Sequence, residues 1–308
     1  KQAKSLNSAV PNFKKANNYQ TLFEKTWKAG DTLVQEDLAQ TLERIRDYGK
    51  AGFYEGKTAD LFVNYVQELG GIVTHVDLKS YKAVWRKPIT FNYKDYQITS
   101  MTLPSSGGIC LAQILKAIEP FNLSDIEHNS TEYIQLLTEA ERVSYAGRGH
   151  HLGHIDFVVT SIDSLTADAY MQNRMTPFVW NKAPPSSQLS HGKILGYESD
   201  ETTHYSIVDG EGNAVSVTTT LNTGYGSKVF VKGAGFFLNN EMDDFSSKPG
   251  VPNVYGLVGS KANEIAPEKR MLSSMTPTIV EHGGKLKMVV GTPGGSTIIT
   301  SVLQNLLN

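Results

Sequence analysis

The spacing of hydrophobic residues in the first half of the chain predicts several amphipathic helices. Apolar side chains recur there every three or four positions, which is the repeat of one helix face. Helices are therefore expected over residues 35–49 and 58–69, over residues 107–118, and around Ile134, Leu137 and Val143. Asn129 and Glu132 form a capping-box pattern in front of the last of these helices, so we expect Asn129 to cap it.

Alternating apolar and polar residues predict antiparallel strands elsewhere. One hairpin is expected over residues 88–101, a second from residue 202 around the turn cluster 209–213, and a third over residues 278–290. A helix-like segment, 298–307, closes the chain. Helices, then antiparallel strands, then a helix together predict an α+β fold in which helices cover the sheets.

A polar segment separates the helical part from the later strands. Residues 179–201 are rich in proline, serine and charged residues, which indicates an exposed linker. It leads into a strand that begins with Thr202 and Thr203. On periodicity alone, the Glu201-Thr202 junction is a loop that meets a strand, and this plain interpretation is favoured over any special role.

Composition and charge argue against several classes of function. The 308 residues can bury a large core in one or two domains, and 40% hydrophobic with 19% charged residues is ordinary for a globular protein. A net charge of -2 gives no support for binding nucleic acid or an anionic membrane. The apolar runs are too short for a membrane helix, and the N-terminal residues show no signal peptide. One cysteine, Cys110, excludes an internal disulfide.

Several short motifs occur in a fixed order along the chain. They are residues 103–108 (LPSSGG), 145–148 (YAGR), 198–222, 238–245 (LNNEMDDF), 248–256 (KPGVPNVYG), 272–275 (LSSM) and 291–296 (GTPGGS). Each motif is weak alone, but together they resemble the γ-glutamyltranspeptidase family over almost the whole chain. The resemblance implies an N-terminal-nucleophile hydrolase, an αββα sandwich of antiparallel sheets flanked by helices, here incomplete because the chain looks truncated at both ends. Residues 1–201 would belong to the large-subunit-like region and residues 202–308 to the small-subunit-like catalytic region, intertwined as one domain.

The resemblance also implies self-cleavage between Glu201 and Thr202. A hydroxyl residue is needed there, because its Oγ attacks the preceding carbonyl and the resulting ester is then hydrolysed. The freed α-amine has a pKa of about 7.7–8.0, so Thr202 would supply both the nucleophile and the general base. Thr220 is expected beside Thr202, and the backbone N–H groups of Gly294 and Gly295 are expected to stabilise an oxyanion. On periodicity alone, Thr220 is an ordinary strand residue.

Acceptor groups are expected to bind the α-ammonium of a γ-glutamyl donor. The resemblance assigns this role to Asn222, Glu241 and Asp244, and a cation does need carboxylates nearby. The spacing of Glu241 and Asp244 places both on one side of a turn. A solvated acidic turn would show the same residues, so the spacing is compatible with cation binding without proving it.

Hydroxyl and aromatic groups complete the expected donor site. Ser273 and Ser274 can donate hydroxyl hydrogens to the α-carboxylate of the donor, although two serines before a proline are otherwise ordinary loop residues. Tyr255, in the loop 248–256, would form a wall of the pocket. A long loop without function is the alternative, and it is less common at this length.

A histidine cluster invites a zinc interpretation, which we do not favour. His150, His151 and His154 lie close in sequence, but nearby glycines weaken a helix there and no His-Glu-x-x-His motif is present. No metal and no cofactor are expected. Members of the family often carry aspartate near positions 147 and 154, where this chain has Gly147 and His154, a departure that bears on local structure.

The function implied is transfer of a γ-glutamyl group from glutathione, glutamine or a similar donor to water or to an amino acid or peptide. Large and small subunits would arise from one precursor, and the parent protein is expected in the periplasm or outside the cell. One alternative is a related acylase of the glutaryl or cephalosporin type, which need not bind an α-ammonium. Another is a catalytically inactive fragment that serves as a structural or binding module.

Overall fold

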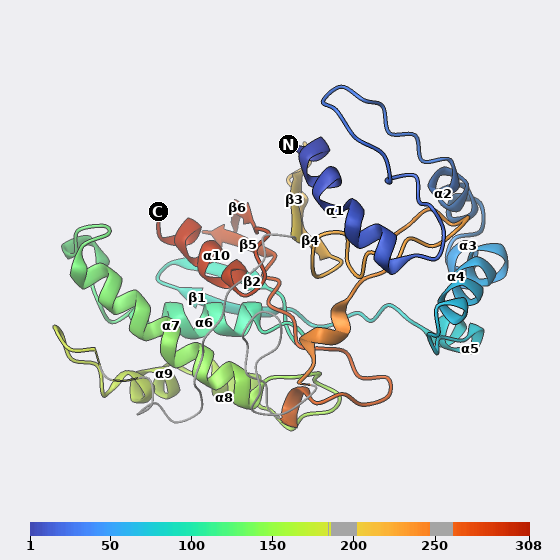
Figure 1. The fold of residues 1–308 in the computed structure, drawn as a ribbon. Coiled ribbons are helices and arrows are strands. Elements are labelled where there is room, and N and C mark those ends of the chain that lie inside the picture. Colours follow the sequence, from blue (N-terminus) through green and yellow to red (C-terminus); the bar gives the residue numbers. More distant parts are fainter. Residues whose placement is uncertain (184, 186–201, 247–260) are drawn as a thin grey trace. The chain divides into compact units, whose positions relative to one another are not determined.

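The computed structural model describes residues 1–183, 185, 202–246 and 261–308 (Figure 1). The longer helices are α1 Gln2–Ala16, α2 Glu36–Tyr48, α4 Gly56–Glu68, α6 Gly107–Ile118, α7 Thr131–His151 and α10 Thr297–Leu307. The shorter ones are α3 Ala51–Tyr54, α5 His75–Ser80, α8 Ile162–Leu165 and α9 Asp168–Met175, with 3-10 turns η1 Leu123–Asp125, η3 Glu241–Asp244 and η4 Lys261–Asn263. The strands are β1 Ile89–Tyr93, β2 Tyr96–Ser100, β3 Thr202–Val208, β4 Ala214–Thr220, β5 Thr278–His282 and β6 Lys285–Val290.

The chain folds into two compact units, and each is built from separate stretches of sequence. The first consists of Lys1–Trp85 and Leu221–Asn240, and the second of Arg86–Thr220 and Glu241–Asn308. The division expected at residue 202 follows a chemical cleavage, not packing, and it stays a prediction.

The first unit is held together by aromatic rings and by one buried asparagine. Phe13 of α1 is fully buried, and its ring centroid lies 5.5 Å from that of Phe23 and 5.3 Å from that of Phe237. Asn17, which follows α1, donates to the Lys228 carbonyl and accepts from the Phe230 N–H, both at 2.9 Å. These contacts join the N-terminal helix to the returning segment Leu221–Asn240.

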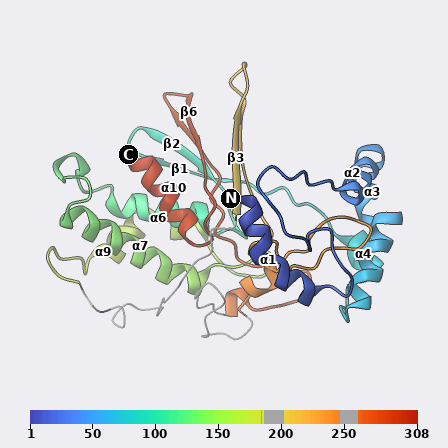
Figure 2. The same cartoon turned by 45° about the horizontal axis from the view of Figure 1, so that its top comes forward.

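The second unit contains a four-stranded antiparallel sheet in the order β1-β2-β5-β6. Alternate residues of β1 are buried, as expected for a sheet with one face on a core. Helices α6, α7 and α10 supply most of the rest of that core and lie together beside the sheet (Figure 2). Gly108 lets α6 approach closely, because a Cβ there would lie 2.4 Å from Ile89 Cγ2 and from the Met101 carbonyl oxygen.

Strands β3 and β4 form a separate two-stranded sheet in the same unit. Side chains attach it to β6: Ser206 Oγ donates to the Val289 carbonyl, and Ser216 Oγ donates to the Val290 carbonyl, both at 3.2 Å. Many of its apolar side chains are exposed, among them Tyr205 at 47% and Ile207 at 54%. The hairpin is therefore held by polar side chains on one face, and most side chains on its other face are exposed in the described structure.

Most of the elements predicted from the sequence are confirmed. The helices over 35–49, 58–69, 107–118 and 298–307 correspond to α2, α4, α6 and α10, and the three hairpins to β1-β2, β3-β4 and β5-β6. The resulting mixture of helices and antiparallel sheets is the α+β fold that the sequence predicted.

Two predictions about α7 are wrong. The cap is Ser130, whose side chain accepts from the Tyr133 N–H, and not Asn129, which has a positive φ of 61° outside the helix. Gly147 does not weaken the helix enough to end it, since α7 continues through His151. Gly147 is buried against neighbouring elements, and this packing outweighs the low intrinsic helix propensity of glycine.

Some expected features lie outside the described residues. These are most of the linker 179–201, including Glu201 of the cleavage junction, and the loop 248–256 with Tyr255. None of the helices in the described ranges combines the length and hydropathy needed to cross a bilayer.

Candidate active site

The hairpin of β3 and β4 pairs the two expected catalytic threonines. Thr202, the first residue of β3, lies directly opposite Thr220, the last residue of β4. Side chains that are directly opposite in an antiparallel pair lie on the same face with their Cβ atoms about 4.5–5.5 Å apart. Both threonines are half-buried. The structure therefore places Thr220 where it can contact the proposed nucleophile, as the sequence predicted.

His204 connects β3 to the glycine-rich loop, residues 291–295. It lies on the same face as Thr202, two residues on, and its ring packs so closely on Gly291 that a Cβ there would lie 2.2 Å from His204 Cε1. Its Nδ1 lies 2.9 Å from Thr218 Oγ1 and its Nε2 lies 3.0 Å from Ser206 Oγ. Because Ser206 donates its hydrogen to the Val289 carbonyl, we assign the ring hydrogen to Nε2. Burial lowers the pKa of His204, which favours this neutral ring.

The expected oxyanion loop has the geometry of a helix N-terminus. Gly294 and Gly295 have positive φ values of 133° and 55°, and they precede α10 directly. Both the N–H and the hydroxyl of Thr297 donate to the Gly294 carbonyl, at 3.0 and 2.7 Å. The N–H groups of the two glycines donate to no acceptor among the described residues. Such N–H groups at the start of a helix suit a developing negative charge.

Ser273 and Ser274 present hydroxyl hydrogens. The Met275 N–H donates to Ser273 Oγ at 3.1 Å, and Arg148 Nη2 donates to Ser274 Oγ at 2.9 Å. Both oxygens therefore already accept a bond from the protein. Neither hydroxyl donates to a partner within the described ranges, so both are available to donate to an external anion. This supports the predicted role in binding a carboxylate.

Arg148 and Tyr145 of α7 position the site, and neither was assigned a role from the sequence. Arg148 is only 6% exposed, and its Nε also donates to Ser106 Oγ at 2.8 Å. Tyr145 donates its hydroxyl to the Ser296 carbonyl at 2.6 Å, beside the start of α10. Their three-residue spacing, on one face of a predicted helix, is the signal that could have linked them.

The acidic pair Glu241 and Asp244 lies on the 3-10 turn η3, and both side chains are half-buried. Burial raises the pKa of Glu241 to about 7, and the nearby Asp244 carboxylate adds to the effect. Burial also raises the pKa of Asp244 to about 7, although the positive charge of Arg148 opposes the increase. Two acids held this way favour a bound cation, which would stabilise their ionised forms.

Asn222 belongs to the first compact unit. It is buried, has a positive φ of 79°, and donates from Nδ2 to the Asn240 carbonyl at 3.2 Å. Its predicted role in substrate binding stays a prediction, as does that of Tyr255, which lies outside the described residues.

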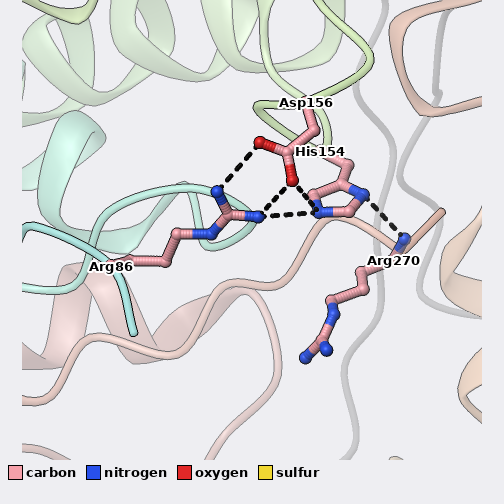
Figure 3. A network of polar contacts seen from close by, with 4 residues as sticks. All are labelled: Arg86, His154, Asp156 and Arg270. Atoms are coloured by element: carbon pink, nitrogen blue, oxygen red, sulfur yellow. Dashed lines mark hydrogen bonds and ion pairs between the residues drawn. The ribbon is translucent and has the colours of Figure 1, made fainter. Parts of the chain in front are cut away.

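His154 is the centre of a polar network at the start of the serine segment, residues 270–274 (Figure 3). Its Nδ1 accepts from the Arg270 N–H at 3.1 Å, and its Nε2 lies 3.2 Å from Arg86 Nη2 and 3.5 Å from Asp156 Oδ2. Arg86 makes two bonds to the Asp156 carboxylate, at 2.9 and 2.5 Å. Burial lowers the pKa of His154, and the positive charges of Arg86, Arg270 and Lys269 lower it further.

The structure gives the histidine cluster a structural explanation. His150 and His151 end α7, and His154 lies beyond the helix, where both of its ring nitrogens face protein groups. Among the residues that the structure describes, no group of three or more His, Cys, Asp or Glu side chains is arranged to hold a metal ion.

Comparison with known proteins identifies similar chains. A family model described as Gamma-glutamyltranspeptidase matches residues 1–308. A curated relative from Escherichia coli (strain K12), named glutathione hydrolase proenzyme, is 50% identical over 91% of this chain, but the match covers 48% of the relative. The chain thus spans about half the length of the curated relatives that it matches.

Two solved structures show the same fold. A gamma-glutamyltranspeptidase from Helicobacter pylori is 37% identical, with a TM-score of 0.59 over 62% of this chain and 56% of that one. A cephalosporin acylase from Bacillus halodurans has a TM-score of 0.79 over 99% of this chain and 54% of that one, at 20% identity. The second likeness bears on the fold alone. Together the two likenesses confirm the fold class that the sequence predicted, the α+β fold of N-terminal-nucleophile hydrolases.

Proposed function

Because the chain belongs to the gamma-glutamyltranspeptidase family, we propose that its parent protein cleaves γ-glutamyl amides by way of an ester on Thr202. Glutathione and glutamine are the proposed donors, and water, an amino acid or a peptide is the acceptor. Maturation requires cleavage between Glu201 and Thr202. In that step Thr202 Oγ attacks the Glu201 carbonyl carbon, and the amide bond breaks as the ester forms, which frees the Thr202 amine. Water then hydrolyses the ester, which releases the Glu201 carboxylate and regenerates the Thr202 hydroxyl.

One observation carries the proposal: Arg148 joins two groups that together fit an α-amino acid. It donates to Ser274 Oγ at 2.9 Å, and its positive charge acts on the Asp244 carboxylate. One part of the site therefore offers hydroxyl hydrogens to an anion, while an adjacent part offers carboxylates to a cation. A γ-glutamyl donor carries an α-carboxylate and an α-ammonium on the same carbon, which is the ligand that this arrangement fits.

The reaction follows from the groups on the hairpin and the glycine loop. Thr202 Oγ attacks the γ-carbonyl carbon while the Thr202 amine takes the hydroxyl proton. Gly294 and Gly295 donate N–H groups to the oxyanion that forms. The amine then passes the proton to the leaving nitrogen, the carbon–nitrogen bond breaks, and a γ-glutamyl ester remains. Water or an acceptor amine attacks this ester, loses a proton to the Thr202 amine and regenerates the hydroxyl.

An acylase that accepts glutaryl groups is the second candidate, and the acidic turn argues against it. A glutaryl donor has no α-ammonium, so two partly buried carboxylates near that position would be left without a cation. Assembly of two subunits from one precursor, and a location in the periplasm or outside the cell, are part of the proposal for the parent protein.

The test is the state of the Glu201-Thr202 bond in the full-length parent protein. Intact mass should show two polypeptides for the wild type, and the mature protein should release p-nitroaniline from γ-glutamyl-p-nitroanilide. Thr202→Ala should stay uncut and inactive, because it has no hydroxyl. Thr202→Ser should still cleave, since it keeps the hydroxyl.

A matched control is Thr203→Ala, because Thr203 is the next residue but points to the opposite, exposed face of β3. It should cleave and turn over as the wild type does. An intact wild-type band with full activity would contradict the proposed maturation. Comparable turnover of glutaryl and γ-glutamyl amides would favour the acylase, and a protein that stays inactive after cleavage would favour a non-catalytic role.

A further inference from the structure

A single buried asparagine connects the acidic turn to the serine segment. Asn263, the last residue of η4, is 5% exposed. Its Nδ2 donates to the Asp244 carbonyl at 2.7 Å, and its Oδ1 accepts from the Leu272 N–H at 2.9 Å. The two partners fix the orientation of the amide, because one is an acceptor and the other is a donor.

The backbone of Asn263 adds a third connection to the same turn. The Ser246 N–H donates to the Asn263 carbonyl at 2.8 Å, next to an isolated parallel bridge between Ser246 and Glu264. Asp244 and Ser246 are therefore both attached to η4. If the turn η3 moved relative to Leu272, one of the two hydrogen bonds of the buried Asn263 amide would break. Each buried polar group left unsatisfied costs about 1–3 kcal/mol.

The serine segment is held in place by other elements. The Ser273 N–H donates to the Pro104 carbonyl, and the Ser106 N–H donates to the Ser273 carbonyl, both at 2.9 Å. Upstream, His154 holds the Arg270 N–H (Figure 3). Ser273 and Ser274 are thus held in place by bonds that do not involve Asn263. Asn263 is a direct hydrogen-bonded link between Asp244 and Leu272, the residue before these serines.

We infer that Asn263 is a positioning residue that sets the spacing between the carboxylates that bind the donor's α-ammonium and the serines that bind its α-carboxylate. This inference rests on the proposed function. Asn263 touches neither the reacting atoms nor the substrate. It allows the carboxylates and the serines to bind the ammonium and the carboxylate of one carbon atom at the same time. A γ-glutamyl group carries both of these charged groups on one carbon, and a simple acyl group carries neither.

The test compares four p-nitroanilides on the mature full-length protein. The γ-glutamyl donor carries both head groups, the glutaryl donor lacks the ammonium, the 4-aminobutyryl donor lacks the carboxylate, and the butyryl donor lacks both. The coupling factor is kcat/KM for the γ-glutamyl donor times that for butyryl, divided by the product of the other two values. It measures how far the two head groups help each other to bind.

Asn263→Leu should lower this coupling factor about tenfold, the effect of one or two lost hydrogen bonds, and leave kcat/KM for the butyryl donor within about twofold of the wild type. Asn263→Gln keeps the amide but moves it by one methylene, so it should give an intermediate factor. Asn305→Leu is the matched control: Asn305 is exposed on α10, where its Nδ2 donates to the Ser301 carbonyl at 2.8 Å. It should leave all four values unchanged.

Three results would overturn the inference. The first is a wild-type coupling factor in both Asn263 variants. The second is an equal loss on all four donors, which would indicate general damage and not a change of spacing. If Asn263→Leu does not fold, these two criteria are applied to the coupling factor of Asn263→Gln alone. The third is a wild type that shows no preference for γ-glutamyl over butyryl, a result that also contradicts the proposed function and is recognised from the wild type alone.

Discussion

The proposed site combines two regions with opposite properties, the β3-β4 hairpin and a wall made by α7 with residues 272–276. The hairpin carries Thr202 and Thr220, and most of its side chains are exposed or half-buried. The wall carries Ser273, Ser274 and Arg148, and it is joined by hydrogen bonds between distant parts of the chain. Strand register alone thus places Thr202 opposite Thr220, whereas the Ser274 hydroxyl of the wall is held by a buried support.

The contrast has a physical cause. In an antiparallel pair, the backbone ladder fixes which side chains are opposite one another, so Thr202 meets Thr220 whatever covers the hairpin. In the wall, Arg148 must be desolvated, and this is tolerated because Ser106 and Ser274 accept its N–H groups. Changes in the wall should therefore alter stability and binding together, and changes in the hairpin should alter chemistry alone.

The largest effect is expected from Arg148→Met, which keeps the apolar stem and removes the charge. It should lower the free energy of unfolding by about 2–4 kcal/mol, because Ser106 and Ser274 lose a charged donor in a buried place. KM for γ-glutamyl donors should increase as well. Urea unfolding and steady-state kinetics measure the two effects. Arg46→Met is the control, since the Arg46–Asp47 pair is exposed to solvent and should contribute little to stability. Equal losses in the two variants would contradict the contrast.

Thr220→Val should separate chemistry from stability in the hairpin. Valine keeps the shape of the β-branched side chain and removes the hydroxyl that faces Thr202, so self-cleavage and turnover should slow by about 100-fold. The melting temperature should not change. Thr219→Val, on the exposed opposite face, should leave the rates unchanged. If both variants slowed cleavage equally, the pairing of Thr202 and Thr220 would have no catalytic role.

Acidic pH should weaken donor binding through Glu241 and Asp244, whose pKa values are both about 7. As the pH falls below about 7 they become neutral, and KM for γ-glutamyl-p-nitroanilide should rise by about tenfold per pH unit for each carboxylate that must be ionised. KM for the butyryl donor, which has no ammonium, should not show this rise as the pH falls. Asp244→Asn should reduce the slope, and an identical slope for both donors would contradict the assigned role.

The same pKa shifts affect stability in the opposite direction. Because both acids have raised pKa values in the folded state, folding takes up protons between the usual unfolded values, about 4, and about 7. Their contribution to stability is therefore fully present below about pH 4 and is lost as the pH rises through about 7. Urea unfolding of the wild type and of Asp244→Asn across this range should show that difference.

The smallest effect is expected at Gly147, inside α7. A Cβ at this position would meet the Tyr170 hydroxyl at 4.0 Å, which is ordinary contact, and the backbone is helical. Gly147→Ala should therefore raise the free energy of unfolding by about 0.4–1 kcal/mol. Thermal unfolding would detect it. Gly153→Ala is the contrasting variant and should destabilise, because its Cβ would lie 2.2 Å from the Ala262 carbonyl oxygen.

The sequence predicted those parts of the site that depend on local pattern. Alternation around residues 209–213 was enough to predict the hairpin, and the Gly294-Gly295 pair was recognised as a strand-to-helix junction. The family resemblance, and not the alternation, put Thr220 beside Thr202. The assignment of roles needed the family resemblance, because threonines, serines and an acidic pair occur in any loop or strand. The capping error at Asn129 shows the same limit, since several neighbouring residues there were suitable caps.

The sequence by itself thus determined the order of helices and hairpins and the chemical types of the binding groups. Only the tertiary structure decided that Arg148 supports Ser274, that Asn263 joins Asp244 to Leu272, and that His154 holds Arg270. The physical reason is range. Periodicity reports neighbours within a few residues, whereas the burial that gives these polar bonds their strength arises from segments about 10 to 130 positions apart in the chain.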